Sequence, residues 1–424
     1  MKKRYFLLIP AILCIIISAA AIGYVHFHPD QVPGGLPDIP DQPQLEEPDD
    51  SDLPDSDAED DKEKDDQDTR VPTSAEKRAE EILDDMTLEE KVYQMLFVRP
   101  ETLTNVQCVV RAGDATKKAI EEMPVGGIIY FSQNFKDRTQ TSTMLSNTQK
   151  YAREAGAGIP MFMGVDEEGG TVARLTSALG TTKFEDMAVY GKDNDGDKAY
   201  EIGETLAKDI SGFGFNVDFA PVADVISNEN NTEIGDRSFG TDPDVVSNMV
   251  RNEVKGLQKN GVMATLKHFP GHGSTESNSH KGTSESDRTV EELRACDLLP
   301  FAAGMEEDAA FVLVSHMTAT EIDDVPCTLS EKIVTDLLRK EMKYDGIAIT
   351  DGMDMGAITE HYSNGEAAVK AVQAGIDVLL CPPSISDAVE ALVEAVEDGD
   401  ISEDRIDESV TRILRAKLAY GLMK

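Results

Sequence analysis

Eight short apolar runs, most of them separated by helical stretches, constrain the fold of this chain more than any other feature. The runs are Gln94–Val98, Gly126–Phe131, Pro160–Val165, Asn216–Ala220, Gly261–Leu266, Ala310–Val314, Gly346–Thr350 and Asp377–Cys381. Helical spacing is found in Asp137–Ala155, Gly196–Ile210, Asp242–Lys259, Val290–Met305, Ser330–Met342 and Gly365–Ala374. Strands that alternate with helices pair in parallel, and eight such units in about 350 residues predict an α/β fold, a (β/α)8 TIM-type barrel. Ile385–Glu397 and Ser402–Gly421 then supply its closing helices.

The N-terminus has the pattern of an export signal. Three basic residues, Lys2 to Arg4, precede an apolar run from Tyr5 to Val25 in which Ser18 is the only plainly polar member. A run of this length can cross a bilayer, and its basic end is expected on the cytoplasmic side. We therefore predict that residues 1–27 are a signal peptide or membrane anchor. The rest of the chain is then exported to the cell envelope, either membrane-anchored or secreted.

Residues 28–73 have the composition of a disordered linker. Seven prolines lie between Pro29 and Pro54, and residues 30–70 hold 17 acidic side chains against three basic ones. Such a segment cannot bury enough apolar surface to offset its ordering entropy, and its like charges keep it extended. An acidic tail that binds a cation or a partner is the alternative. The formal charge of the whole chain, −40, argues against nucleic acid as a partner. Residues 74–424 are left as the barrel.

The segment after the fifth apolar run has the densest chemistry. Lys267-His268-Phe269-Pro270-Gly271-His272-Gly273 continues to His280 and Gly282, and it holds three of the seven histidines. Its proline and glycines indicate a loop that leaves a strand end. Three interpretations are open: a metal site of His268, His272 and His280, acid/base catalysis by one histidine, or a polar surface loop. Pro270 and Gly271 break the helical spacing of a zinc motif, so acid/base catalysis is favoured.

Other polar residues also follow the predicted strands. These positions are Asn134, Asp166–Gly170, Asp224, Lys267, His268, His316 and Asp351–Asp354. In a barrel of parallel strands these points lie on one rim, where catalytic residues gather. A sugar site needs such a ring of directional partners, one for each hydroxyl. Each position taken alone is weak, since an Asp after a strand is as often a helix cap.

Four blocks in this order carry a family resemblance. They are Asp166-Glu167-Glu168-Gly169-Gly170-Thr171-Val172-Ala173-Arg174, Ala220–Asp224 with Gly235-Asp236-Arg237-Ser238-Phe239-Gly240, Lys267–His280, and Ile349-Thr350-Asp351. From about Thr87 to Ala419 the chain resembles the family 3 glycoside hydrolases, in the single-domain β-N-acetylglucosaminidase branch that trims peptidoglycan fragments. Other branches are similar in the first and last blocks but take their acid from a second domain. Glu167 stands where the family usually has Gln.

The resemblance implies roles for individual residues. It makes Asp351 the nucleophile, and a carboxylate at a strand end can form a glycosyl-enzyme that water later cleaves. An N-cap role is the alternative for Asp351, and Asp354 is read as a solvated or first-turn charge. The resemblance further places five residues on the hydroxyls and acetamido group of the sugar: Asp166, Arg174, Arg237, Lys267 and His268. Both arginines can instead be structural ion-pair partners.

By the same resemblance, His280 is the acid/base of this branch. A histidine titrates near neutral pH and can donate a proton to the leaving oxygen, although an exposed loop histidine is the alternative. The branch pattern has an Asp two residues earlier that orients and charges the imidazole, and here that position is Asn278. Its amide oxygen can orient the ring but carries no charge. Glu276 is a candidate substitute.

The sequence therefore predicts an exo-acting, retaining β-N-acetylglucosaminidase (a β-N-acetylhexosaminidase) that acts on terminal N-acetylglucosamine of peptidoglycan-derived or related glycans. The alternatives are an envelope-tethered sugar-binding protein with weakened catalysis, a family 3 β-glycosidase of different sugar specificity, and a metal-dependent hydrolase. We expect a carbohydrate as the partner, contact with the membrane through the N-terminal segment, and a monomer. We expect neither a cofactor nor a metal ion.

Overall fold

The computed structural model describes residues 73–275 and 284–423. The predicted signal or anchor, residues 1–27, and almost all of the predicted linker, residues 28–73, lie outside these ranges, as do Glu276, Asn278 and His280. Within the ranges, none of the helices has the length and apolar content that a membrane span needs.

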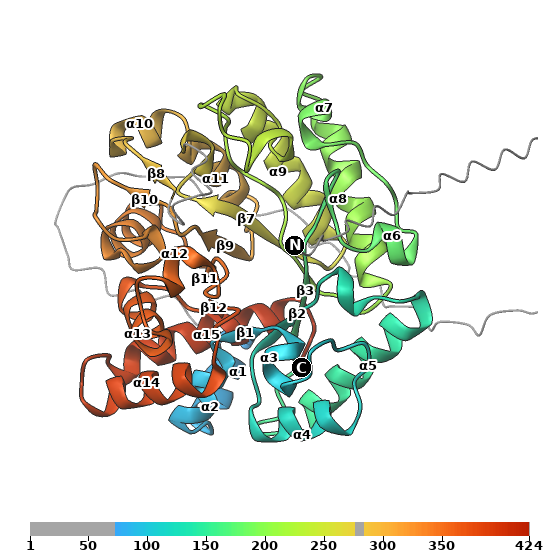
Figure 1. The fold of residues 1–424 in the computed structure, drawn as a ribbon, viewed down its shortest axis with the longest axis vertical. Coiled ribbons are helices and arrows are strands. Elements are labelled where there is room, and N and C mark those ends of the chain that lie inside the picture. Colours follow the sequence, from blue (N-terminus) through green and yellow to red (C-terminus); the bar gives the residue numbers. More distant parts are fainter. Residues whose placement is uncertain (1–72, 276–283, 424) are drawn as a thin grey trace, which may run out of the picture. The chain divides into compact units, whose positions relative to one another are not determined.

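Eight parallel strands form a nearly closed barrel (Figure 1). Their order around the sheet is β11-β9-β7-β6-β3-β2-β1-β12, and an isolated bridge between Ile349 and Val378 joins its two ends. The strands are β1 (Leu96–Val98), β2 (Gly127–Ile129), β3 (Phe162–Val165), β6 (Val217–Asp218), β7 (Met263–Phe269), β9 (Phe311–Val314), β11 (Ile347–Thr350) and β12 (Leu379–Leu380). Seven of them lie within the apolar runs and β7 begins in the remaining one, so the predicted barrel is confirmed. Two small pairs lie outside the barrel: β4 (Glu167–Gly169) with β5 (Val172–Ala173), and β8 (Glu285–Ser286) with β10 (Thr318–Ala319).

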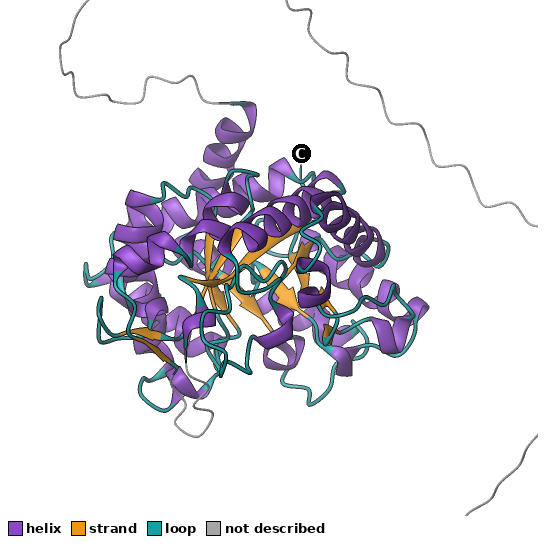
Figure 2. Cartoon of the chain, turned by 90° about the horizontal axis from the view of Figure 1, so that it is seen from above, coloured by secondary structure: helices purple, strands orange, loops and turns teal. Residues whose placement is uncertain are grey.

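Helices surround the strands (Figure 2). Most long ones begin at a Thr, Ser or Asp whose side chain accepts a hydrogen bond from the first turn, and Thr73, Thr87 and Thr289 form complete capping boxes. The α-helices are α1 (Ser74–Asp84), α2 (Leu88–Gln94), α3 (Pro100–Thr104), α4 (Asp114–Glu122), α5 (Arg138–Glu154), α6 (Thr176–Leu179), α7 (Met187–Gly191), α8 (Gly196–Ser211), α9 (Pro243–Lys259), α10 (Val290–Ala295), α11 (Leu298–Met305), α12 (Gly356–Thr359), α13 (Asn364–Ala374), α14 (Ile385–Glu397) and α15 (Glu403–Ala419). Short 3-10 turns span Ser132–Asn134, Gly235–Arg237, His272–Ser274 and Cys327–Leu329, and Lys332–Glu341 is a π-helix.

Two boundaries differ from the sequence prediction. The predicted helix Val290–Met305 is two helices, α10 and α11, with a non-helical residue at Cys296 (φ −140°, ψ −73°). The break has a local cause, because Pro300 cannot follow Cys296 in one continuous helix without its ring meeting the carbonyl four residues earlier. The second difference concerns β7. It runs three residues beyond Leu266 to Phe269, so Lys267 and His268 lie in the strand rather than in the loop.

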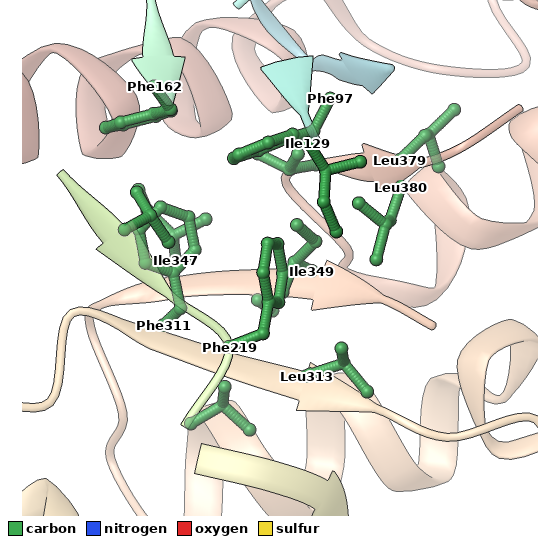
Figure 3. Packing of buried hydrophobic residues seen from close by; sticks show 14 of the residues in the cluster. Phe97, Ile129, Phe162, Phe219, Phe311, Leu313, Ile347, Ile349, Leu379 and Leu380 are labelled. Atoms are coloured by element: carbon green, nitrogen blue, oxygen red, sulfur yellow. The ribbon is translucent and has the colours of Figure 1, made fainter. Parts of the chain in front are cut away.

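Phenylalanine rings fill the interior of the barrel (Figure 3). The ring of Phe97 on β1 stacks at 6.2 Å on that of Phe162 and meets that of Phe219 edge-on at 5.5 Å. This arrangement requires glycine on β2 and β3. A Cβ at Gly127 or at Gly164 would lie 2.8 or 2.7 Å from the Phe97 ring. The core thus closes the barrel and leaves its carboxyl-end rim for polar side chains.

Glu253 on α9 gives a stability prediction. It is 1% exposed, and no described residue donates a hydrogen bond to its carboxyl oxygens. Burial, helped by the charge of Glu168, raises the pKa of Glu253 from 4.5 to about 8. Because the native state favours the protonated acid, the contribution of Glu253 to the free energy of unfolding is full below pH 4.5 and is lost as the pH rises through 8.

We therefore expect that the free energy of unfolding of Glu253→Gln does not fall in this way. Measured against the wild type, the stability of the variant should improve by about 1–3 kcal/mol between pH 5 and pH 8. Urea unfolding at both pH values measures the gain, with Glu390→Gln at an exposed site of α14 as the control. Parallel losses in the variant and the wild type between pH 5 and 8 would contradict the assignment.

Candidate active site

The predicted site residues converge on one rim of the barrel because each follows a parallel strand. Asp166 comes directly after β3, Lys267 and His268 end β7, and Asp351 comes directly after β11. The β4–β5 hairpin adds Glu168 from the same side. Residues up to 185 positions apart in the sequence thereby share one surface.

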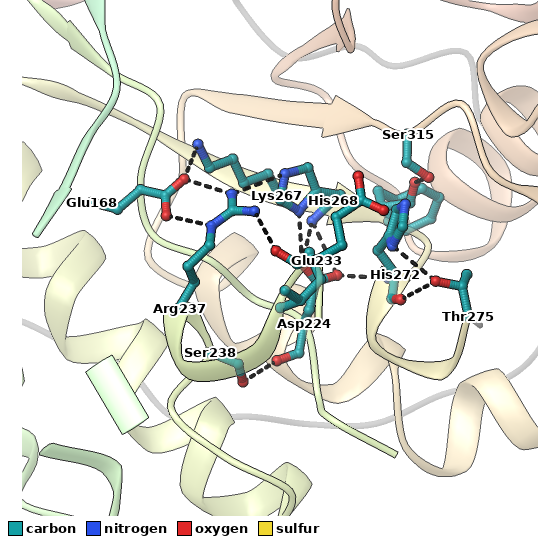
Figure 4. A network of polar contacts seen from close by, with 12 residues as sticks. Glu168, Asp224, Glu233, Arg237, Ser238, Lys267, His268, His272, Thr275 and Ser315 are labelled. Carbon is teal, nitrogen blue, oxygen red and sulfur yellow. Dashed lines mark hydrogen bonds and ion pairs between the residues drawn. The ribbon is translucent and has the colours of Figure 1, made fainter. Parts of the chain in front are cut away.

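A chain of opposite charges runs across this rim (Figure 4). Lys267 Nζ lies 3.0 Å from Asp166 Oδ1 and 2.6 Å from Glu168 Oε1. Arg237 donates two parallel hydrogen bonds to Glu168, from Nε at 2.8 Å and from Nη2 at 2.7 Å. Burial alone would raise the pKa of Glu168, but Lys267 and Arg237 lower it to about 2. Glu168 is therefore a permanent anion that fixes both cations in place.

Asp224 organises a second set of contacts. Fully buried, it accepts hydrogen bonds from the ring Nδ1 of His268 at 2.7 Å and from the backbone N–H of His272 at 2.7 Å. Against the effect of burial, the two histidines hold the pKa of Asp224 below its usual range. The bond from Nδ1 leaves Nε2 of His268 on the side of Arg237, whose Nη2 is 3.5 Å away. Asp224 thus sets the orientation and tautomer of His268.

The carboxylate of Asp351 is held by its own backbone. The N–H of Gly352 donates to Asp351 Oδ1 at 2.7 Å. Burial would raise the pKa of Asp351, but His316, His268, this backbone N–H and Lys267 together lower it. The carboxylate is therefore ionised at neutral pH, which is the state a nucleophile requires.

Arg174 and Asp354, the two remaining charged residues discussed for this rim, also form ion pairs. Arg174 Nη2 lies 3.7 Å from Asp166 Oδ2, and its guanidinium lies 6.0 Å from the ring centre of Phe131. Asp354, interpreted from the sequence as a solvated or first-turn charge, instead pairs with Arg99 at 2.8 Å. That ion pair links the segment after β11 to the residue that follows β1. The spacing of the two residues in the sequence does not predict it.

The structure thus brings together the predicted substrate-binding residues and the predicted nucleophile. These are Asp166, Arg174, Arg237, Lys267, His268 and Asp351. The predicted acid/base His280 and the orienting Asn278 lie outside the described residues. Across residues 73–275 and 284–423, no three His, Cys, Asp or Glu side chains converge as a metal site would require.

Glu168 and Asp224 stand in motifs that the sequence marks as part of the rim, but their individual roles were not predicted. Both are buried and both orient the cations or imidazole beside them. The signal in the sequence is weak, because Glu167 stands next to Glu168 and has the same side chain. Glu167 turns elsewhere and accepts hydrogen bonds from Leu175 N at 3.0 Å and Thr181 Oγ1 at 3.2 Å.

Comparisons with known proteins agree with this geometry. The beta-hexosaminidase A of Pseudoalteromonas piscicida is 31% identical over 323 residues, which cover 70% of this chain and 54% of that protein. The beta-hexosaminidase of Idiomarina loihiensis is 30% identical over 312 residues, which cover 72% of this chain and 90% of that protein. This chain therefore spans about half the length of the first relative and nine tenths of the second.

Solved structures give the same answer. A glycoside hydrolase family 3 beta-N-acetylglucosaminidase from Paenibacillus sp. superposes with a TM-score of 0.74 at 35% identity, over 80% of this chain and 63% of that one. The beta-N-acetylhexosaminidase from Beutenbergia cavernae superposes with a TM-score of 0.70 at 28% identity, over 80% of this chain and 99% of that one. The sequence profile described as the glycosyl hydrolase family 3 N terminal domain matches residues 87–416. The match covers more than half of the chain, which is therefore a member of glycosyl hydrolase family 3.

Proposed function

We propose that this glycoside hydrolase removes terminal N-acetylglucosamine from glycans as an exo-acting enzyme that retains the anomeric configuration. The observation that carries the proposal is the ionised carboxylate of Asp351, which lies on one rim with the Asp166–Lys267–Glu168–Arg237 chain. The names of the relatives, beta-hexosaminidase and beta-N-acetylglucosaminidase, support the same sugar.

The reaction has two steps. In the first, an oxygen of Asp351 attacks the anomeric carbon, the bond to the leaving oxygen breaks, and that oxygen takes a proton. In the second, water attacks the glycosyl-enzyme, gives up a proton and releases the carboxylate. Two inversions at one carbon give net retention.

The proton donor in this scheme is His280, and this role rests on the resemblance of the Lys267–His280 segment to the β-N-acetylglucosaminidase branch. A histidine with a pKa near neutral serves both as the acid of the first step and as the base of the second. An asparagine at position 278 can orient an imidazole through its amide oxygen but supplies no charge. This difference favours a slower enzyme than one with Asp at that position.

Substrate binding uses the charged residues of the rim. Asp166 can accept from sugar hydroxyls, while Lys267, Arg174 and Arg237 can donate to hydroxyls and to the acetamido oxygen. His268, fixed by Asp224, offers Nε2 on the same side. Because Glu168 and Asp166 together balance the charges of Lys267 and Arg237, the site suits a neutral sugar.

A direct test compares two chromogenic substrates, a 4-nitrophenyl β-N-acetylglucosaminide and the matching β-glucoside. We expect kcat/KM for the N-acetylglucosaminide to exceed that for the glucoside by at least about 100-fold, because buried donors left unpaired by the missing acetamido group cost free energy. Turnover should be unchanged in EDTA. Preference for the glucoside, or binding without turnover of either substrate, would contradict the proposal.

We also propose that the barrel acts outside the cytoplasmic membrane on peptidoglycan-derived or related glycans. The support is the apolar run Tyr5–Val25, followed by the acidic, proline-rich residues 28–73. A chain of residues 73–424 should be soluble and should match the kinetics of the full chain on small substrates. Loss of the folded state in that truncation, seen by circular dichroism, would show that the barrel extends further toward the N-terminus.

A further inference from the structure

His316 contacts the backbone directly after the nucleophile. It lies two residues beyond β9 and is 3% exposed. Its Nε2 is 3.0 Å from the carbonyl oxygen of Gly352, and its Nδ1 is 2.7 Å from the hydroxyl of Thr328. Gly352 is also the residue whose N–H donates to Asp351 Oδ1.

The carbonyl partner of the ring fixes the position of one of its protons. A carbonyl oxygen can only accept, so Nε2 carries a hydrogen and donates it to Gly352. On the other side of the ring, the hydroxyl of Thr328 contacts Nδ1 and also lies 2.7 Å from the carbonyl oxygen of Ser315. The hydroxyl can therefore donate its hydrogen either to Nδ1 or to this carbonyl. The donation from Nε2 holds in the neutral and in the charged form of the ring, so the contact to Gly352 does not depend on the protonation of His316.

The remaining contacts restrain the same segment from other directions. Asp351 N–H donates to Val314 O on β9 at 2.9 Å, and Met353 N–H donates to Leu380 O on β12 at 2.8 Å. Among the described residues, the imidazole of His316 is the side-chain donor to the carbonyl of Gly352. Asp351 and Asp354 are the charged groups that face the ring.

We propose that His316 is a positioning residue for the nucleophile. By holding the carbonyl of Gly352, it keeps the Gly352 N–H on Asp351 Oδ1, so that Oδ2 is the oxygen that attacks the anomeric carbon. Thr328 holds the ring in the plane that this contact needs. The inference rests on the proposed function, in which Asp351 is the nucleophile.

The test uses His316→Leu, His316→Gln and Thr328→Val, with His361→Leu at an exposed histidine ten residues after Asp351 as the control. On the 4-nitrophenyl N-acetylglucosaminide, His316→Leu should lower kcat by about 10- to 100-fold with KM within about threefold, because a small displacement of a reacting group costs this much. His316→Gln keeps an amide donor and should recover most of the loss. Thr328→Val should lower kcat less, in the same direction.

The pH profile separates positioning from a general loss of packing. Burial raises the pKa of Asp351, and His316 is the first of the groups that lower it. Loss of the imidazole should therefore raise the pKa of Asp351, and the acidic limb of kcat/KM should move to higher pH in both His316 variants. Packing damage alone would lower the melting temperature without moving the limb, and that result would overturn the inference.

The outcome can be distinguished from a failure of the proposed function. If Asp351→Ala keeps its activity, the nucleophile assignment is wrong and His316 has no such role. If Asp351→Ala is inactive while Thr328→Val matches His361→Leu in kcat and His316→Gln matches His361→Leu in pH profile, this inference alone is wrong. His316→Gln and Thr328→Val are conservative in volume, so the test does not depend on the folding of His316→Leu.

Discussion

Replacing Asp351 with alanine is expected to lower kcat/KM by roughly 10⁴-fold or more, the size of effect seen when a covalent nucleophile is removed. The free energy of unfolding should fall only modestly, because the groups around Asp351 stabilise its carboxylate against the effect of burial. Turnover of the 4-nitrophenyl substrate and thermal melting measure the two quantities separately.

Asp354→Ala is the matched control for this prediction. Asp354 lies on the same segment, three residues on, but its partner is Arg99 and its side chain is 33% exposed. Its removal should leave kcat/KM within about tenfold, since surface ion pairs contribute little. Asp351→Ala with near wild-type turnover would remove Asp351 from the nucleophile role.

The second large effect is expected at Glu168. Glu168→Gln keeps the shape of the side chain but leaves the buried cations Lys267 and Arg237 without their shared anion. Breaking a buried ion pair from one side costs about 3–5 kcal/mol, and KM should rise if both cations bind the sugar as proposed. Urea unfolding and steady-state kinetics measure these effects.

The pH dependence of this loss has a defined sign. The pKa of Glu168 falls from 4.5 to about 2 on folding, since its two cations outweigh burial. Its contribution to stability is therefore full above pH 4.5 and is lost as the pH falls toward 2. The difference between the wild type and Glu168→Gln should shrink over that interval.

The neighbouring Glu167→Gln provides the control. Glu167 is equally buried, but its partners are Leu175 N and Thr181 Oγ1. In glutamine the amide oxygen can accept from Leu175 N and the amide NH2 can donate to the Thr181 hydroxyl. Burial raises the pKa of Glu167, so a neutral side chain is tolerated there. The control should unfold within about 1 kcal/mol of the wild type. If Glu168→Gln loses as little free energy of unfolding as this control, Lys267 and Arg237 do not need the Glu168 carboxylate as a partner.

The sequence predicts the barrel well because its cause is local. An apolar run such as Ile347–Thr350 is buried on both faces, and its length and flanking residues suffice to identify a strand. The extent of β7 was missed because Lys267 and His268 are polar. They remain in the strand since Phe269 pairs with Val314 on β9 across a register shift, a contact between distant residues.

The site shows the same division. Strand ends locate Asp166, Lys267 and Asp351 on one rim, and this follows from topology alone. What each side chain touches does not, because Arg237 and Glu168 are 69 residues apart and nothing in their spacing pairs them. Arg237 is both an ion-pair partner and a member of the rim. The two interpretations left open by the sequence are therefore compatible.

Trapping the covalent intermediate is the most direct test that Asp351 is the nucleophile. The enzyme would be incubated with a fluorinated N-acetylglucosaminyl fluoride, whose glycosyl-enzyme forms readily and hydrolyses slowly, and then digested with trypsin. We expect the peptide from Tyr344 to Lys370 to gain the mass of one sugar, and fragmentation of the peptide to place that sugar on Asp351. A label on another residue, or an unlabelled enzyme that releases N-acetylglucosamine with inverted configuration by NMR, would contradict it.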